Sequence, residues 1–261
     1  MELKGLYTAL TTPFKNGKVD YETLARLVEM QIRNGADGIA PVGTTGESPT
    51  LNYEEHSKVI SEVVRIAAGR CKVMAGSGAN STEEALSLTK QAKADGADFS
   101  LQVTPYYNKP SQEGLYRHFS TIADSCDIPI VLYNIPGRSG VPIAAETIAR
   151  LAKNSNVIGV KEAGGSVDRI SEILSLCDID ILSGDDSLTL PMMAAGAKGV
   201  VSVASNVIPK EMKELVDLCD KGDYAAARVL QKKLYRFFKA MTIETNPIPV
   251  KAAMAMRGLM E

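Results

Sequence analysis

Lys161 has the clearest potential for chemistry in this sequence, because it interrupts the otherwise apolar segment VIGVKEA. A buried ammonium is costly unless its head reaches water or pairs with a carboxylate such as that of Glu162. Apolar surroundings also favour the neutral amine, which attacks carbonyl groups to form a Schiff base. The segment by itself leaves a structural lysine and a catalytic nucleophile equally open.

Further polar residues follow other apolar segments. Thr44 and Thr45 lie in the glycine-rich string GTTGES, Tyr133 ends the segment IPIVLY, and Arg138 lies in GRSG. An arginine can bind a carboxylate through two parallel hydrogen bonds, and a tyrosine can transfer protons when a hydroxyl group assists it. A solvated loop arginine and a core tyrosine are the plainer interpretations. None of these residues decides the function alone.

The charge balance narrows the possible partners. The 29 Lys and Arg residues nearly match the 31 Asp and Glu residues, for a formal charge of -2. Nucleic acid is therefore not expected as a partner, because phosphate contacts need clustered cations. No apolar run approaches the roughly 20 residues of a membrane helix, and the segment MELKGLYTALTTPF lacks the features of a signal peptide. We therefore expect a cytoplasmic protein with no membrane partner.

Cysteine and histidine are too few and too scattered for common metal sites. The four cysteines contain no CxxC pair, and the two histidines lie far apart in the sequence; these residues are Cys71, Cys126, Cys177, Cys219, His56 and His118. Buried free thiols are the expected state of such cysteines. No metal site is predicted, and a Ser-His-Asp triad is disfavoured.

Short apolar runs alternate with helical patterns along most of the chain. The runs are Leu6–Pro13, Gly38–Val42, Lys72–Gly76, Phe99–Thr104, Ile128–Ile135, Val157–Glu162, Ile179–Ser183 and Gly199–Val203. Continuous apolar runs of this length are typical of parallel strands that are buried on both faces. Eight strands, each followed by a helix, predict an α/β protein with the (β/α)8 TIM-barrel fold. A doubly wound open sheet is the competitor, but no GxGxxG string follows the first run.

Capping residues mark where several helices begin. Asp20 and Ser111 can each cap a helix, and Asn52 with Glu55 and Ser81 with Glu84 have the spacing of capping boxes. Pro142 and Pro209 suit first helical turns. Beyond Val203 only helical patterns remain, through Ala225–Met241 and Ile248–Leu259. We therefore predict a catalytic barrel domain over residues 1–221 and a short C-terminal helical appendage over 222–261.

In a TIM barrel the functional groups lie at the carboxyl ends of the strands. The predicted strand ends are followed by six motifs: GTTGES from Gly43, TPYYNKPSQEG from Thr104, LYNIPGRSG from Leu132, VKEAGG from Val160, LSGDDS from Leu182 and, further on, NPIPVK from Asn246. Together, in this order, they resemble the dihydrodipicolinate synthase family, and the resemblance covers essentially the whole chain. The family belongs to the class I aldolases, which form Schiff bases on a (β/α)8 barrel and include N-acetylneuraminate lyase and 2-keto-3-deoxygluconate aldolase.

The resemblance implies a role for each matching residue. Lys161 would form an imine with pyruvate, and Tyr133 would relay protons together with Thr44 and with Tyr107 from a partner subunit. Thr45 would hold the pyruvate carboxylate, Arg138 would bind the carboxylate of L-aspartate 4-semialdehyde, and Gly184 and Val201 would line the pocket. The product would be 4-hydroxy-tetrahydrodipicolinate, in the biosynthesis of lysine and diaminopimelate. The resemblance implies no cofactor and no metal.

Two alternatives compete with this activity. The sister aldolases accept long polyhydroxylated aldehydes, and they need no arginine for an amino-acid carboxylate at the position of Arg138. A noncatalytic ligand-binding barrel would have lost the imine lysine or the tyrosine, whereas Lys161 and Tyr133 are both present. The synthase is therefore the predicted activity.

The resemblance also implies an inhibitory site for L-lysine at a dimer interface. Its matching positions are Ser48, Tyr53, His56, Asn80, Glu84 and Tyr106. Glu84 could pair with the effector's ammonium, and Asn80 and Tyr106 could hold its carboxylate end. Local interpretations compete, because Glu84 fits a capping box and His56 could lie on a helix surface.

The oligomeric state is the remaining expectation. Tyr107 in its implied role requires at least a homodimer, and dimers of dimers are common in the family. The sequence stops soon after NPIPVK, whereas family members usually continue through further helices. A changed tetramer arrangement is therefore possible, while the catalytic positions all lie upstream.

Overall fold

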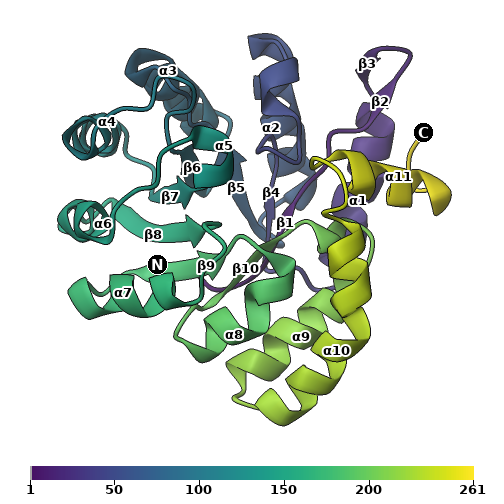
Figure 1. Cartoon of the computed structure of the whole chain (residues 1–261). Helices are drawn as coiled ribbons and strands as arrows, with labels where there is room; N and C mark the ends of the chain where they lie inside the picture. The colour runs from purple at the N-terminus through teal and green to yellow at the C-terminus, as the bar shows by residue number, and fades with distance from the viewer. Residues whose placement is uncertain (1) are drawn as a thin grey trace.

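The computed structural model describes residues 2–261 and contains a closed barrel of parallel strands (Figure 1). Around the barrel the strand order is β1-β10-β9-β8-β7-β6-β5-β4. The strands are β1 Gly5–Ala9, β4 Gly38–Ala40, β5 Lys72–Gly76, β6 Phe99–Val103, β7 Ile130–Asn134, β8 Val157–Glu162, β9 Asp180–Ser183 and β10 Gly199–Ser202. A small antiparallel pair, β2 Phe14–Lys15 and β3 Lys18–Val19, follows β1. The predicted TIM-barrel fold is confirmed, since each predicted apolar run overlaps one barrel strand.

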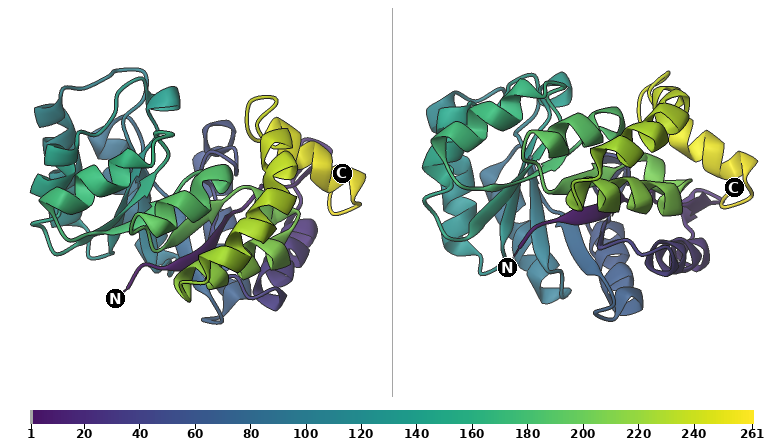
Figure 2. Two further views of the ribbon diagram at one scale, coloured as in Figure 1. Left: turned by 60° about the horizontal axis from the view of Figure 1, so that its bottom comes forward. Right: turned by 90° about the horizontal axis from the view of Figure 1, so that it is seen from below.

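Helices surround the strands in the views of Figures 1 and 2. They are α1 Tyr21–Arg33, α2 Tyr53–Ala67, α3 Thr82–Ala94, α4 Gln112–Ser125, α5 Pro136–Ser139, α6 Ala145–Leu151, α7 Asp168–Leu176, α8 Thr189–Ala194, α9 Pro209–Asp220, α10 Tyr224–Ala240 and α11 Ile248–Met256. Three short 3-10 turns lie at strand ends: η1 Ser48–Thr50, η2 Asp186–Leu188 and η3 Ala204–Asn206. No helix within residues 2–261 has the length and apolarity needed to cross a membrane.

The predicted helix starts are mostly confirmed. Asp20 and Ser111 cap α1 and α4, and Asn52 with Glu55 forms a complete capping box on α2. The second predicted box is wrong in part: Ser81 accepts from the backbone N–H of Glu84, but the Glu84 side chain does not return to the cap. That carboxylate instead accepts a hydrogen bond from another helix, as described below.

Pro142 does not lie in a helical turn, because α6 begins only at Ala145. Its backbone oxygen accepts a hydrogen bond from the Gln112 side-chain amide, and the side-chain oxygen Oε1 of Gln112 accepts from the backbone N–H of Ala144. These contacts hold the residues before α6 in an extended loop. Pro209, in contrast, lies in the first turn of α9 as predicted.

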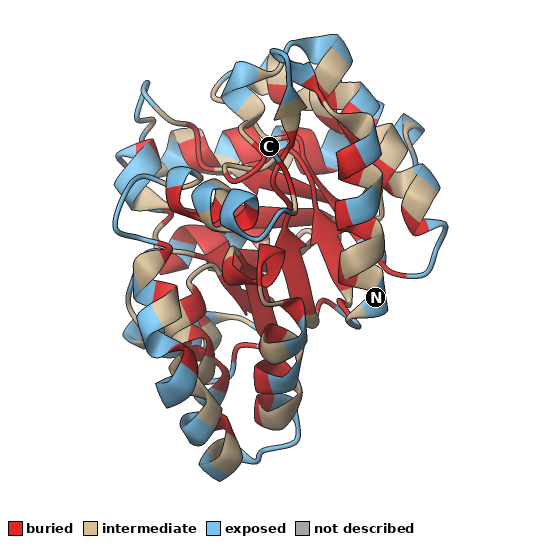
Figure 3. Cartoon of the chain, turned by 90° about the vertical axis from the view of Figure 1, so that its right-hand side faces the viewer, coloured by how far each residue is buried: buried red, intermediate tan, exposed pale blue. Residues whose placement is uncertain are grey.

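Apolar side chains fill both the barrel and the layer between the strands and helices. Figure 3 shows the buried residues concentrated on the central strands. Inside the barrel, Tyr7, Met74, Phe99, Leu101 and Val201 pack with the ring of Tyr133. Two larger clusters join the outer faces of the strands to the helices. The strands are thus buried on both faces, as their continuous apolar sequences predict.

The chain after α9 runs back over the barrel. Leu234 and Phe238 of α10 are part of the core shared with the neighbouring helices, and Val250 and Met254 of α11 join the core beside α1 and α2. The division into domains at residue 221 stays a prediction. What the packing shows is that α10 and α11 share their cores with the barrel.

Candidate active site

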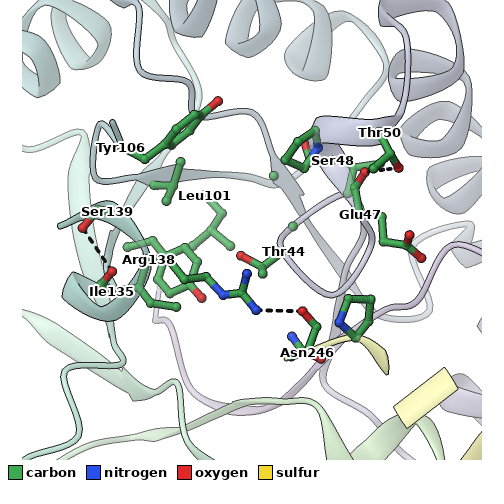
Figure 4. A pocket seen from close by; sticks show the side chains of 18 residues that line it. Thr44, Glu47, Ser48, Thr50, Leu101, Tyr106, Ile135, Arg138, Ser139 and Asn246 are labelled. Atoms are coloured by element: carbon green, nitrogen blue, oxygen red, sulfur yellow. Dashed lines mark hydrogen bonds between the residues drawn. The ribbon is translucent and has the colours of Figure 1, made fainter. Parts of the chain in front are cut away.

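A cavity of about 390 Å³ opens at the carboxyl ends of the barrel strands (Figure 4). Its lining includes Thr44, Ser48, Tyr106, Tyr133 and Arg138, all of which the sequence analysis singled out. These residues lie on four separate segments of the chain, in the loops after β4 and β6, on β7 and on α5. The barrel closure therefore brings together side chains that the sequence could only place at strand ends.

Lys161 lies on β8 directly opposite Tyr133 of β7 in the strand register. Its side chain is buried, with 6% of its surface exposed, and its Nζ lies 4.0 Å from the centroid of the Tyr133 ring. No residue among 2–261 offers it a carboxylate partner. The alternative pairing of Lys161 with Glu162 is wrong, because successive side chains of a strand point to opposite faces. Lys161 thus faces the barrel interior and contacts the aromatic ring that lines the cavity.

Glu162 is fully buried on the outer face of the barrel. Both of its oxygens accept from the Asn134 side-chain amide, at 2.8 and 2.9 Å, and Oε1 also accepts from the backbone N–H of Gly164. Burial raises the pKa of this carboxyl, while the donated hydrogen bonds and Arg169, 3.7 Å away, oppose the rise. Because Asn134 and Glu162 are also cross-strand partners, this network joins β7 to β8 beside Tyr133 and Lys161.

Thr44 and Thr45 occupy the loop after β4 but have different surroundings. Thr44 lines the cavity, whereas Thr45 is buried and its Oγ1 accepts a hydrogen bond from the Asn246 side chain at 3.0 Å. Within the described residues no hydrogen bond joins the hydroxyl groups of Thr44 and Tyr133. The predicted link between these two residues therefore stays a prediction.

Arg138 lies on the exposed edge of the cavity, on α5. Its Nη2 donates to the backbone oxygen of Asn246 at 2.7 Å, as Figure 4 shows. Asn246 also lines the cavity, so one residue contacts both Arg138 and Thr45. Asn246 lies in the motif NPIPVK, but no strand pattern precedes this motif, so the sequence predicts no place for Asn246 in the site.

Three further residues predicted for the site do not line the cavity: Tyr107, Gly184 and Val201. Tyr107 is 90% exposed, has a positive φ of 73°, and does not line the cavity of its own chain. Gly184 follows β9, and a Cβ there would lie 2.6 Å from the Cβ of Ala163. Val201 is buried among the interior residues that pack with Tyr133. Gly184 and Val201 are therefore part of the barrel wall.

Four of the six residues predicted to bind L-lysine contact one another in two pairs. The Tyr53 hydroxyl donates to Glu84 Oε1 at 2.9 Å, and the Asn80 amide donates to the Tyr106 backbone oxygen at 3.1 Å. The hydrogen bond to Glu84 raises the pKa of Tyr53, and burial, followed by the Glu84 charge, raises the pKa of Tyr106. Ser48 and Tyr106 both line the cavity.

His56 does not lie on a helix surface. It is buried, and its Nε2 lies 2.9 Å from the backbone oxygen of Gly76. Burial lowers the pKa of this imidazole. The alternative of a solvated His56 is therefore wrong, because α2 turns this side chain toward β5.

Comparisons with known proteins place the chain in a family. Residues 2–261 match the dihydrodipicolinate synthetase family. The 4-hydroxy-tetrahydrodipicolinate synthase of a Hydrogenobaculum species is 58% identical over 261 residues, covering 99% of this chain and 90% of that protein. The solved synthase from Methylacidiphilum fumariolicum SolV is 54% identical, with a TM-score of 0.99, over 100% of this chain and 88% of the other. The solved synthase from Aquifex aeolicus is 54% identical, with a TM-score of 0.98. That match covers 99% of this chain and 89% of the other. The chain belongs to the dihydrodipicolinate synthetase family and is an enzyme.

Proposed function

We propose that this enzyme condenses pyruvate with L-aspartate 4-semialdehyde to give 4-hydroxy-tetrahydrodipicolinate. The observation that carries the proposal is the position of Lys161, buried at the end of a barrel strand, without a carboxylate partner among residues 2–261, and against the ring of Tyr133. The amine lies beside a phenol that can transfer protons. It is therefore suited to attack a keto acid.

In the proposed reaction the Lys161 amine adds to the keto carbon of pyruvate, and water leaves to form an imine. Loss of a proton from the pyruvate methyl group gives an enamine, whose carbon attacks the aldehyde. The amino group of the second substrate then attacks the imine carbon, closes the ring and displaces Lys161. Tyr133 is the proposed donor and acceptor of these protons, assisted by Thr44 and by Tyr107 of a partner subunit. The scheme uses no metal and no organic cofactor.

Two further features support this choice of substrates. The guanidinium of Arg138 lies on the exposed edge of the cavity and can reach the carboxylate of an entering amino acid. A solved relative from Acinetobacter baumannii, 44% identical, is described as complexed with pyruvate. Thr45 is the proposed partner of the pyruvate carboxylate, with Gly184 and Val201 in the adjoining wall. The sister aldolases remain the second candidate until the aldehyde is tested.

Borohydride reduction in the presence of pyruvate tests the proposal. Peptide mapping should find a pyruvate-derived adduct on Lys161 and on no other lysine. Lys161→Ala should lose both the adduct and turnover, and Lys161→Arg, which keeps a cation but cannot form the imine, should lose them equally. Turnover at the native rate in either variant would disprove the mechanism, and preference for a sugar aldehyde would favour the sister aldolases.

We also propose that L-lysine inhibits the enzyme at the cluster of Ser48, Tyr53, His56, Asn80, Glu84 and Tyr106. Glu84 supplies a carboxylate for the effector's ammonium, and a solved relative from Cyanidioschyzon merolae, 41% identical, is described with lysine bound. Titration with lysine should lower activity, whereas norleucine, which lacks the side-chain ammonium, should act weakly. Glu84→Gln should weaken the inhibition, and full activity of the wild type at millimolar lysine would refute it.

A further inference from the structure

We infer that Lys251, on helix α11, is a positioning residue for the loop Gly43–Ser48, which carries Thr44 and Thr45. The inference deepens the proposed function, because it rests on the roles proposed for these two threonines. It assigns the C-terminal segment a part in shaping the cavity, beyond its share in the core.

The primary contact is an ion pair between Lys251 Nζ and the carboxylate of Glu47. Both side chains are mostly covered, with 21% and 25% of their surfaces exposed, so water screens the pair less than it screens an open surface pair. The Lys251 ammonium also lies 4.5 Å from the centroid of the Phe14 ring. The pair joins residues that are 204 positions apart in the sequence.

The backbone of the loop needs such a contact. Glu47 has φ 57° and ψ 39°, the left-handed region that a side chain disfavours. The preceding Gly46 is tightly enclosed, since a Cβ there would lie 2.8 Å from the backbone nitrogen of Val42. A disfavoured conformation persists only where its surroundings determine it. The ion pair with Lys251 is one contact that holds Glu47 in place.

A second contact from the same segment reaches the loop at Thr45, two residues before Glu47. The side-chain amide of Asn246 donates to Thr45 Oγ1 at 3.0 Å. Figure 4 shows Glu47 pointing away from Thr44 and Arg138, while Asn246 lies beside the Arg138 guanidinium. The chain from Asn246 to Lys251 therefore contacts the loop at Thr45 and at Glu47, on opposite sides of Gly46. Loss of one contact should loosen the loop without removing a group that touches substrate.

The test compares Lys251→Met with Lys251→Arg and with the matched control Lys15→Met. Methionine keeps much of the apolar stem but removes the charge. Lys15 also pairs with the C-terminal segment, through Glu261, but that pair is exposed and lies outside the loop. We expect Lys251→Met to raise the KM for pyruvate roughly tenfold, the size of effect that one partly covered charged contact produces. The kcat should change less than the KM, Lys251→Arg should restore most of the loss, and Lys15→Met should match the wild type.

Hydrogen exchange of peptides that contain residues 43–48 supplies a readout independent of activity. These amides should exchange faster in Lys251→Met than in the wild type or Lys15→Met. If Lys251→Met does not fold, Glu47→Gln removes the same pair from the other side and should give the same two effects. Unchanged KM and unchanged loop exchange in a folded variant would overturn the inference.

The outcomes separate this inference from the proposed function. If wild-type Lys161 fails to trap pyruvate, the proposed function is wrong, and loop exchange still decides whether Lys251 positions the loop. If wild-type Lys161 traps pyruvate while Lys251→Met behaves like Lys15→Met, the inference alone fails.

Discussion

Asp186 shows how a single buried carboxyl can hold a loop at the barrel's carboxyl end. Its Oδ2 accepts from the backbone N–H groups of Val203 and Ala204, at 3.1 and 2.8 Å, just after β10. Oδ1 has no hydrogen-bond partner among the described residues. Burial raises the pKa of this carboxyl to about 6, against the effect of the hydrogen bonds that it accepts.

This raised pKa predicts a pH dependence of stability. The folded protein keeps the proton of Asp186 to higher pH than the unfolded chain does. Protonated Asp186 therefore adds to the free energy of unfolding at low pH, and this contribution is lost as pH rises from about 4 to above 6. A rise from 3.8 to about 6 corresponds to about 3 kcal/mol. The unfolding free energy of the wild type, relative to Asp186→Asn, should therefore fall by up to about 3 kcal/mol between pH 4 and pH 7. Urea denaturation at several pH values measures it, and a constant difference would contradict it.

At the scale of elements, the pairing of β7 with β8 aligns the residues proposed for catalysis. The register places Tyr133 opposite Lys161 on the inner face and Asn134 opposite Glu162 on the outer face. The Asn134 amide donates to both oxygens of a carboxylate that is fully buried, and the Asn134 oxygen accepts from the backbone N–H of Ile143. The outer pair thus fixes the alignment of the inner one.

Asn134→Ala should destabilise the protein by about 3 kcal/mol, because it leaves a buried carboxylate without two of its hydrogen bonds. Guanidinium denaturation measures the loss. Asn154→Ala is the matched control: it removes two hydrogen bonds near the surface, one donated to Asp124 and one accepted from the backbone N–H of Asn156, and should cost only about 1 kcal/mol. Equal losses in the two variants would show that the network adds nothing beyond an ordinary surface contact.

At the scale of the whole molecule, the proposed mechanism requires two chains to complete one site. Tyr107 is almost fully exposed, next to the cavity residue Tyr106, and has a positive φ. A solved relative, 46% identical, is described as a monomeric dihydrodipicolinate synthase variant. In this chain the shared tyrosine, within a homodimer or homotetramer, is part of the proposal.

Mixing two inactive variants tests the shared site. In a mixed dimer of Lys161→Ala with Tyr107→Phe, one site keeps both the lysine and the tyrosine, since each comes from a different chain. Unfolding and refolding the variants together should recover roughly a quarter of the wild-type activity, because half of randomly paired dimers are mixed and each has one complete site of two. Either variant refolded alone should stay inactive. No recovery from a mixture that sediments as dimers would place Tyr107 and Lys161 in the same chain's site.

Much of this protein could be predicted from the sequence, for local physical reasons. Continuous apolar runs of five to eight residues are typical of strands buried on both faces, and capping residues such as Asp20 and Asn52 act within one helical turn. The strand-end rule then placed Thr44, Tyr133 and Arg138 around one cavity. Each of these inferences needs only neighbours in the sequence and one general rule of barrel architecture.

Other features depend on which distant segments meet, and only the tertiary structure decided them. The carboxylate of Glu84 accepts from Tyr53 on another helix instead of closing its own capping box. The alternation of side chains along β8 turns Glu162 away from Lys161 and toward Asn134. Asn246 reaches Thr45 and Arg138 across more than a hundred residues of chain, because α10 and α11 return over the barrel. A side chain's partner depends on packing between elements, and local sequence does not contain that information.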